Sequence, residues 1–351
     1  MVLAAGTGSA AEHRTLVENE RSLPLIINKQ FARTAWNVVL AASALAFAAP
    51  SHAALTWHWI NQPADPNLTT TITNNMNAAV ADFNTYANYT GDIPVNYNSG
   101  VPTAQTDSYR GWIEFGGSYS QRTCEHEMSH WLVNGTYSAW FNFNGTGRWA
   151  GASAQALEQL FDGPNAYLSC DSIHYWPYGA NYDNEPWGFR HIAMCGALCA
   201  DCGLGDVTIW PNPSGVYRLQ NRESGLYLDG MGRTANGSIV AQYASSGSNN
   251  QKWRITALGG HFFKLQNVAT GLYLDTGGNT ANGSTIQQWG GGGSWNQQWS
   301  FTPVDSGYVN IVCRASAQVV DNYGSNSNGA NMVNWGWWFG NDINQQWRLV
   351  Q

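Results

Sequence analysis

The strongest constraint on the fold is a triplicated pattern in the C-terminal part of this 351-residue chain. Three Gln-x-Trp motifs recur there, at Gln251-Lys-Trp253, Gln297-Gln-Trp299 and Gln345-Gln-Trp347. An aspartate recurs at positions 229, 275 and 321, at equal intervals of 46 residues. A fixed period of this length is typical of architectures in which one unit cannot bury its apolar face alone. Because Gly and Asn turns separate short alternating segments, the pattern predicts one all-β domain made of three units.

The three units differ in how closely they match. Gly225-Leu-Tyr-Leu-Asp229 and Gly271-Leu-Tyr-Leu-Asp275 are close copies, whereas the third unit has Ala317-Gln-Val-Val-Asp321. Three Gln-x-Trp motifs in register resemble the ricin-B-type lectin family, a β-trefoil also used as a carbohydrate-binding module in secreted hydrolases. The resemblance covers residues 216–351, after a linker at 211–215. It implies that the motif tryptophans lie mainly in the core and that the domain binds carbohydrate.

The resemblance also implies a sugar pocket in each unit. A sugar presents hydroxyls at its edge and C–H bonds on its face, so a pocket needs a carboxylate, an aromatic ring and an amide. The expected pockets are Asp229, Tyr243 and Asn250; Asp275, Trp289 and Asn296; and Asp321, Trp335 and Asn344. The amides before the aromatic residues are expected to assist: Gln242, Gln288 and Asn334. Galactose- or xylan-type glycans are the expected ligand classes. For any one pocket, the alternative is a degenerate repeat that is structural and binds no sugar.

A second motif, His126-Glu-Met-Ser-His130, lies in the first half of the chain. On a helix, its two histidines are four residues apart and project from one face, where they can bind one zinc ion. Glu127 lies beside the first histidine and can deprotonate a zinc-bound water. A helix that carries a satisfied histidine pair by chance is the alternative.

The third zinc ligand is open between two residues. The extended metzincin pattern fails, because Val133 and Thr136 stand where it needs Gly and His. Glu158, on an expected short helix, is one candidate, and His174 in His174-Tyr-Trp-Pro-Tyr178 is the favoured one. This arrangement resembles zincin-like domains attached to ricin-B repeats in secreted bacterial proteins. Tyr178 and Tyr137 are the candidates for stabilising the oxyanion.

The elements around this motif predict an α+β domain. Apolar residues in 67–88 recur at three- and four-residue steps, which indicates an amphipathic helix. Other segments are expected as strands at 55–60, 93–97 and 110–115, and as helices at 153–160 and 186–199. Helix, strands and then a motif-bearing helix resemble zinc peptidases of the zincin type. The chain is therefore predicted to be multidomain, with a zincin-like domain at 54–210 followed by the β-trefoil.

Composition and the N-terminal segment predict export. Only 11% of residues are charged, and the 38 Gly, 18 Trp and 16 Tyr are typical of secreted proteins that face carbohydrate. Residues 1–28 are expected to be disordered or to reflect a mis-called start. Residues 29–53 hold a basic patch, fourteen uncharged residues and a small-residue end, which describe a signal peptide cleaved after Ala53. Fourteen residues are too few to span a membrane, so no membrane association is expected after cleavage.

These observations narrow the function. The net charge of −7 argues against a nucleic-acid partner. The favoured hypothesis is a secreted zinc endopeptidase, tethered by its lectin domain and acting on proteins or glycoproteins by metal-activated water. A non-enzymatic secreted lectin with an inactive zincin-like domain, or a glycan-hydrolysing protein, are the alternatives, although the carboxylates show no glycosidase pattern. Some of the six cysteines are expected to pair in an exported protein, whereas Cys313 is expected to be free.

Overall fold

The computed structural model describes residues 54–337 and 342–351. The expectations for residues 1–28 and for the signal peptide at 29–53 lie outside these residues, and they stay predictions. In the part of the chain that is described, no helix is both long and apolar enough to cross a membrane.

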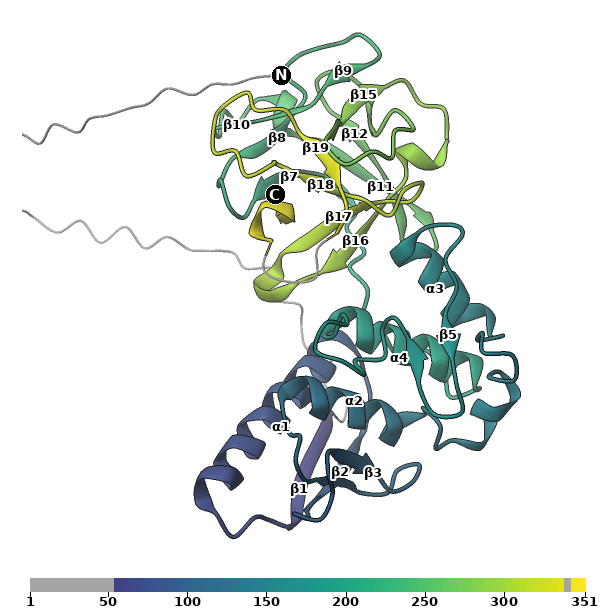
Figure 1. Cartoon of the computed structure of the whole chain (residues 1–351). Coiled ribbons are helices and arrows are strands. Elements are labelled where there is room, and N and C mark those ends of the chain that lie inside the picture. The colour runs from purple at the N-terminus through teal and green to yellow at the C-terminus, as the bar shows by residue number, and fades with distance from the viewer. Residues whose placement is uncertain (1–53, 338–341) are drawn as a thin grey trace, which may run out of the picture. The chain divides into compact units, whose positions relative to one another are not determined.

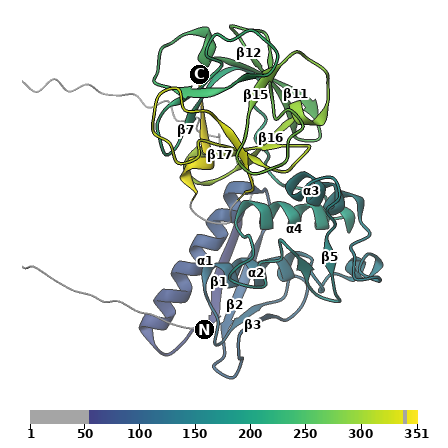
Figure 2. The ribbon, with the colours of Figure 1, turned by 45° about the horizontal axis from the view of Figure 1, so that its top comes forward.

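The N-terminal region contains a four-stranded mixed sheet in the order β1-β2-β4-β3. Three of its strands, β1, β2 and β3, are labelled in Figure 2. Strands β1, β2 and β4 are parallel, and β3 pairs antiparallel with β4 at the edge. The strand bounds are Leu55–Asn61 for β1, Gly91–Tyr97 for β2, Ala104–Thr106 for β3 and Ile113–Phe115 for β4. Strand β3 lies between the strands expected at 93–97 and 110–115 and was not predicted, because three residues show no measurable alternation.

Helix α1 (Pro66–Tyr86) connects β1 to its parallel neighbour β2. The side chain of Asp65 accepts a hydrogen bond from the Asn67 amide, and proline stands in the first turn, where its missing N–H costs nothing. The buried residues recur at helical spacing and are Ile72, Met76, Ala79, Val80 and Phe83. The sequence prediction of an amphipathic helix is confirmed.

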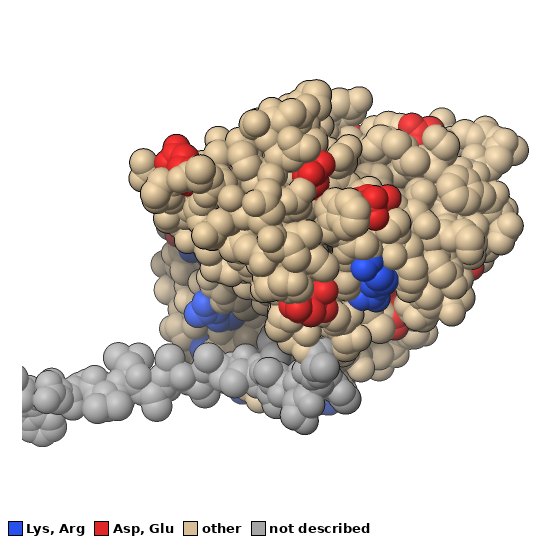
Figure 3. All heavy atoms as spheres, turned by 90° about the horizontal axis from the view of Figure 1, so that it is seen from below, with Lys and Arg blue, Asp and Glu red and all other residues tan. Residues whose placement is uncertain are grey.

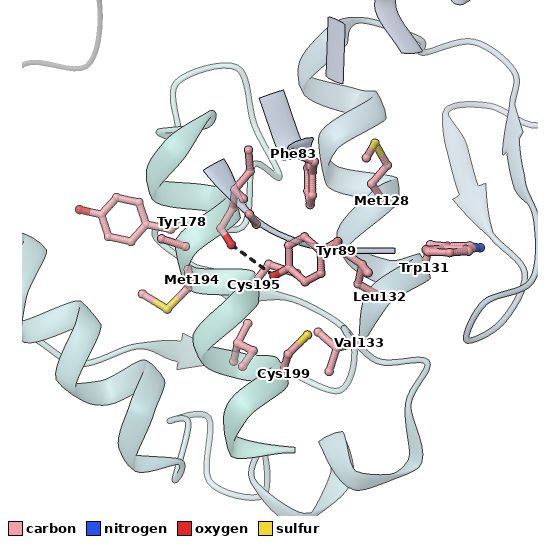
Figure 4. Close-up of a cluster of buried hydrophobic side chains, with 14 of the residues drawn as sticks. Phe83, Tyr89, Met128, Trp131, Leu132, Val133, Tyr178, Met194, Cys195 and Cys199 are labelled. Carbon is pink, nitrogen blue, oxygen red and sulfur yellow. Dashed lines mark hydrogen bonds between the residues drawn. The ribbon is translucent and has the colours of Figure 1, made fainter. Parts of the chain in front are cut away.

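The remaining elements of this region surround a large buried core. They are α2 (Gln121–Leu132), η1 (Ser138–Asn142), α3 (Ala152–Asp162), β5 (Ser169–Cys170), β6 (Tyr175–Trp176) and α4 (Phe189–Asp201). Figure 4 shows Tyr89 lying between α2 and α4, where its hydroxyl donates to the Ile192 carbonyl at 3.5 Å. Met194 is also buried in this core. Because α4 is buried over eleven consecutive residues, it forms the centre of the region.

The C-terminal region is all-β (Figure 1). Its longer strands are β7 (Gly215–Asn221), β11 (Trp253–Gly259), β12 (Phe262–Asn267), β16 (Trp299–Pro303), β17 (Val309–Cys313) and β20 (Gln346–Val350). Each pairs antiparallel with the next, and β20 pairs with β7, so the six strands close into a ring. A closed barrel has no free edge, which is the benefit that three joined units gain.

Shorter strands form one hairpin in each unit. The hairpins are β8 (Tyr227–Asp229) with β10 (Ala241–Tyr243), β13 (Tyr273–Asp275) with β15 (Gln287–Trp289), and β18 (Val319–Asp321) with β19 (Val333–Trp335). Strands β9 (Ser238–Ile239) and β14 (Ser284–Thr285) pair with the hairpin of the following unit. A six-stranded ring with three hairpins is the predicted β-trefoil.

The motif tryptophans lie in the core, as expected. Trp253, Trp299 and Trp347 are fully buried. Their indole N–H groups donate to backbone carbonyls of the hairpins at 2.9 to 3.0 Å. The preceding turns η2 (Asn249–Gln251), η3 (Trp295–Gln297) and η5 (Ile343–Gln345) are equivalent in the three units, and η4 (Asp305–Gly307) stands apart. Each motif therefore connects one strand of the ring to the hairpin of its unit by a hydrogen bond from the tryptophan.

The cysteines of the chain, which all lie within the described residues, form no disulfide bond. All six cysteines are free and buried, so the expectation that some of them pair is not met.

The face drawn in Figure 3 is largely uncharged, with isolated acidic and basic side chains. Contacts on this face therefore depend mainly on neutral polar and aromatic side chains.

Candidate functional sites

Three histidine rings converge in the N-terminal region. Helix α2 begins after Ser120, whose hydroxyl accepts from the Thr123 amide, and it carries His126 and His130 one turn apart. His174 comes from the loop between β5 and β6. Its ring stacks on that of His126, with ring centroids 5.5 Å apart, and contacts the ring of His130 edge-on, with centroids 5.2 Å apart. One potential ligand atom from each of the three side chains lies within 4.8 Å of the others. The structure thus brings together the two motif histidines and the favoured third residue.

Hydrogen bonds fix the tautomers of the motif histidines. The Nδ1 atom of His126 lies 2.9 Å from the Gly179 carbonyl oxygen, and Nδ1 of His130 lies 2.8 Å from the Asn134 carbonyl oxygen. A carbonyl only accepts, so both Nδ1 atoms carry the proton and both Nε2 atoms present lone pairs. Burial lowers the pKa of His130 to about 4 and that of His126 well below its ordinary value, so both rings are neutral.

The two Nε2 atoms face each other at 3.1 Å. Two lone pairs at this distance repel, whereas two nitrogens bound to one tetrahedral zinc at 2.0–2.1 Å would lie about 3.3 Å apart. The donor set therefore fits a zinc ion, in both the type of atom and the spacing.

The third histidine is fixed by an acidic neighbour. The Oδ1 atom of Asp171 accepts from the backbone amides of Ile173 and His174, at 2.8 and 2.6 Å. Its Oδ2 atom lies 3.6 Å from Nδ1 of His174. A carboxylate behind a ligating imidazole orients the ring and raises its basicity. Sequence analysis missed Asp171, although its place three residues before His174 was a usable signal.

The motif glutamate is held by the edge strand. Glu127 is 4% exposed, and burial raises its pKa to about 7. The hydroxyl of Thr106, on β3, lies 2.9 Å from both the Oε2 atom and the backbone carbonyl oxygen of Glu127. Thr106 therefore fixes the carboxylate relative to the sheet.

Two other sequence candidates take part in a different cluster. The Tyr178 hydroxyl is buried; it donates to Asp162 at 2.8 Å and accepts from Arg190 at 2.9 Å. The donor of this hydroxyl is directed at Asp162, and the role of Tyr178 in stabilising an oxyanion stays a prediction. Glu158 lies by the same cluster, where burial and then Asp162 raise its pKa to about 9. Within residues 54–337 and 342–351 it is not part of the histidine group. Tyr137, the other oxyanion candidate, packs against Tyr109.

The aspartates of the three expected sugar pockets occupy equivalent places. Each is almost fully buried at the end of the first hairpin strand, and each accepts from a backbone amide two residues later. In the second unit, Asn296 and Gln297 also donate to Asp275, at 2.6 and 2.7 Å. The third unit repeats this arrangement, with Asn344 and Gln345 donating to Asp321.

The first unit differs at the same point. Gln251 donates to the carbonyl of Ala244 at 2.8 Å rather than to Asp229. The side chain of Asn250 has no hydrogen-bond partner among the described residues, and Met231 uses only the Oδ1 atom of Asp229. The Asn250 amide and the other Asp229 oxygen therefore remain available for a ligand.

The aromatic platforms also differ between units. Tyr243 and Trp289 are 40% and 43% exposed. Trp335 is partly buried beside Tyr323, with ring centroids 5.4 Å apart. Around Trp289 the surface is hollowed into a cavity of about 470 Å³, lined among others by Asp275, Asn296 and Asn236. The second pocket thus has room for a sugar, and it includes Asn236, a residue of the first unit that sequence analysis missed.

The amides that precede the platforms are buried. Gln242, Gln288 and Asn334 are at most 1% exposed. Their side chains donate to backbone carbonyls in loops of another unit, namely those of Ser325, Gly230 and Asn279. These bonds hold the three amides against neighbouring loops, and the expectation that they assist sugar binding stays a prediction.

Comparisons with known proteins concern the C-terminal region. The family described as ricin-type β-trefoil lectin domain-like matches residues 207–289 and 295–351. A designed three-fold symmetric protein, ThreeFoil, is 38% identical; the match covers 39% of this chain and 99% of that one, with a TM-score of 0.38. An exo-β-1,3-galactanase from Clostridium thermocellum is 30% identical over 43% of this chain but only 33% of its own length, with a TM-score of 0.37. A ricin B-like lectin of Macrolepiota procera, solved with lactose, is 20% identical over 40% of this chain and 99% of that one, with a TM-score of 0.35.

A search of curated proteins finds no match. The family match, the closed ring of six strands and the three buried motif tryptophans agree with one another. The C-terminal region of this chain is a ricin-type β-trefoil lectin domain.

Proposed function

We propose that the chain is a secreted, glycan-binding zinc endopeptidase that acts on glycoproteins or on proteins held in a glycan matrix. The observation that carries the proposal is the convergence of His126, His130 and His174, with Glu127 beside them. Three imidazole ligands that leave a position open are typical of catalytic zinc. Export is proposed from the sequence of residues 29–53.

Each residue of the site would have a defined role. The three histidines would hold the ion, and zinc, when bound, supplies a Lewis acid that acidifies water and polarises a carbonyl. Glu127 would take a proton from the attacking water and pass it to the leaving nitrogen as the C–N bond breaks. Thr106 would hold the Glu127 carboxylate in the orientation needed for both transfers.

The lectin domain would bring the peptidase to its substrate. Exposed Tyr243 and Trp289 rings offer platforms for C–H faces, and buried Asp229 and Asp275 offer acceptors for hydroxyls. Single sites of this kind are shallow, so binding strength would come from several pockets that act on one polymer. We propose galactose- or xylan-type glycans as the ligands.

The decisive variant is Glu127→Gln in the mature chain. Loss of the proton acceptor should lower casein or mucin cleavage by about 10²–10⁴-fold. Zinc content per chain, measured by atomic emission, should stay unchanged, because Glu127 is not a ligand. Retention on immobilised galactose or xylan should also persist.

Two controls complete this experiment. Glu223→Gln, a matched change in the lectin domain, should leave cleavage intact, and His126→Ala should lose both zinc and cleavage. Full peptide cleavage by Glu127→Gln would contradict the peptidase mechanism. A purified wild-type chain that binds glycan and zinc but cleaves neither protein would favour the alternative of a lectin with a non-enzymatic N-terminal domain.

A further inference from the structure

An Asn-Gly turn recurs in each unit of the trefoil outside the expected pockets. The turns are Asn236-Gly237, Asn282-Gly283 and Asn328-Gly329, spaced by the same 46 residues as the pocket aspartates. The three glycines have φ angles of 84°, 83° and 81°, a region that favours glycine. The repetition of both sequence and conformation indicates one shared role.

The side chain of each turn asparagine accepts a hydrogen bond from the backbone amide that follows the aromatic platform of another unit. The Oδ1 atom of Asn236 accepts from the Gly290 amide at 2.8 Å, directly after Trp289. Asn282 accepts in the same way from Gly336, after Trp335, at 2.8 Å. Asn328 accepts from Ala244, after Tyr243, at 2.7 Å, so the third unit serves the first. The three bonds run around the ring in one direction.

The turn glycines bond to the backbone on the N-terminal side of each aromatic residue. The amides of Gly237, Gly283 and Gly329 donate to the carbonyls of Gln288, Asn334 and Gln242, at 2.9, 2.9 and 2.7 Å. These acceptors directly precede the three platforms. A side chain added at Gly237 would stand 3.5 Å from the Trp289 ring, and one at Gly283 would stand 3.4 Å from the Trp335 ring. The turn therefore lies against the ring and fixes the backbone before and after it.

Asn236 also has a free donor. An amide side chain has one acceptor oxygen and two N–H donors. Its oxygen is used by Gly290, whereas its Nδ2 atom has no partner among the described residues. The side chain is exposed and lines the cavity that contains Asp275, Trp289 and Asn296. Asn282 differs in its acceptor, because its oxygen accepts from Gln318 as well as from Gly336.

We propose that the Asn-Gly turn of each unit positions the aromatic platform of the next, and that Asn236 additionally donates a hydrogen bond to the sugar in the second pocket. Each sugar site is therefore built by two units of the trefoil. Asn282 and Asn328 are positioning residues, and Asn236 has both roles. The proposal rests on the carbohydrate binding proposed above.

The test isolates the second pocket. Tyr243→Ala and Trp335→Ala together remove the other two platforms, and binding of galactose and xylo-oligosaccharides is then measured by titration calorimetry. Asn236→Asp keeps the acceptor for Gly290 and removes the donor, so affinity should fall about 2–10-fold, the range for one neutral hydrogen bond. Asn236→Ala removes both groups and should weaken binding further. It should also shift the Gly290 and Trp289 amide signals in a ¹⁵N-labelled NMR spectrum, whereas Asn236→Asp should shift them less.

Asn282→Ala is the matched control. It removes the equivalent side chain of the second unit, whose partner lies in the third pocket, so second-pocket affinity should stay within twofold of the background. Equal losses from Asn236→Ala and Asn282→Ala, or no loss from either, would overturn the proposal. If the unmodified chain binds neither sugar, the proposed ligand classes fail. The Gly290 and Trp289 signals still decide the positioning role in that case, because they need no ligand.

Discussion

At the scale of single residues, the N-terminal site is defined by what lies behind each histidine. Two backbone carbonyls set the protonation of His126 and His130, and their Nε2 atoms meet at 3.1 Å. A chance histidine pair on a helix surface has no reason to bury two lone pairs against each other. The motif could be predicted from sequence because it depends on helical spacing alone. Thr106 comes from β3, 21 residues before Glu127, so the local pattern could not identify it. Asp171 lies three residues before His174, so it could have been found from its spacing.

A first prediction concerns Asp171. Replacing it by Asn keeps the size of the side chain and removes the charge near Nδ1 of His174. Zinc affinity, measured by competition with a chromogenic chelator, should fall about 10–100-fold, as is common for a lost carboxylate behind a ligating histidine. Asp183→Asn, at a side chain 93% exposed, is the control and should leave affinity unchanged. An unaltered affinity in Asp171→Asn would contradict a supporting role of Asp171 behind His174.

The hydrogen-bond partners of Tyr178 could not be predicted from sequence. The sequence offered this phenol as a candidate because a tyrosine hydroxyl can donate a hydrogen bond to an oxyanion. In the structure its hydroxyl lies between Asp162 and Arg190, which come from α3 and α4. A polar group inside a core must find partners, and only the tertiary fold determines which partners are available.

At the scale of elements, long periodic segments could be predicted from sequence, whereas the short strands β3, β5 and β6 could not. Helix α1 has an apolar stripe, a capping aspartate and a proline in its first turn, so three local signals agree. Strands β3, β5 and β6 have two or three residues each and depend on pairing with distant segments. The Asn-Gly turns were visible as a 46-residue repeat, but their contact with the next unit required the closed ring.

A second prediction tests the start of α1. Asp65→Ala removes the side chain that accepts from the Asn67 amide, and the free energy of unfolding should fall by about 0.5–2 kcal/mol. Urea denaturation followed by far-ultraviolet circular dichroism measures the change. Asp65→Ser keeps a capping oxygen and should recover most of the loss. If the alanine and serine variants are equally unstable, the cap does not stabilise the helix.

At the scale of the whole molecule, the described residues form two hydrophobic cores. One gathers buried side chains between Leu55 and Cys202, and the other gathers them between Tyr217 and Trp347. The β-trefoil could be predicted from sequence because its repeats state the symmetry directly. The N-terminal region has no repeat, so sequence indicated its α+β class and its motif but not its edge strand.

A third prediction uses the separation of the cores. Zinc at a hundredfold excess over its dissociation constant adds about 2.7 kcal/mol to the stability of the domain that binds it. Chelation by EDTA should therefore lower the melting temperature of the N-terminal transition in scanning calorimetry and leave that of the trefoil unchanged. The His130→Ala variant should show no response to EDTA. An equal response in both transitions would place the ion elsewhere.

The direction in which the Asn-Gly turns bond has a consequence for how such a chain could arise by duplication. Each turn completes the pocket of the following unit, and the last completes the first. An ancestor with a single unit would therefore have held no finished pocket within one polypeptide. Three separate copies would have had to assemble before the aromatic platform of any copy was positioned by the Asn-Gly turn of another. Fusion of the copies into one gene would then have made this assembly independent of concentration.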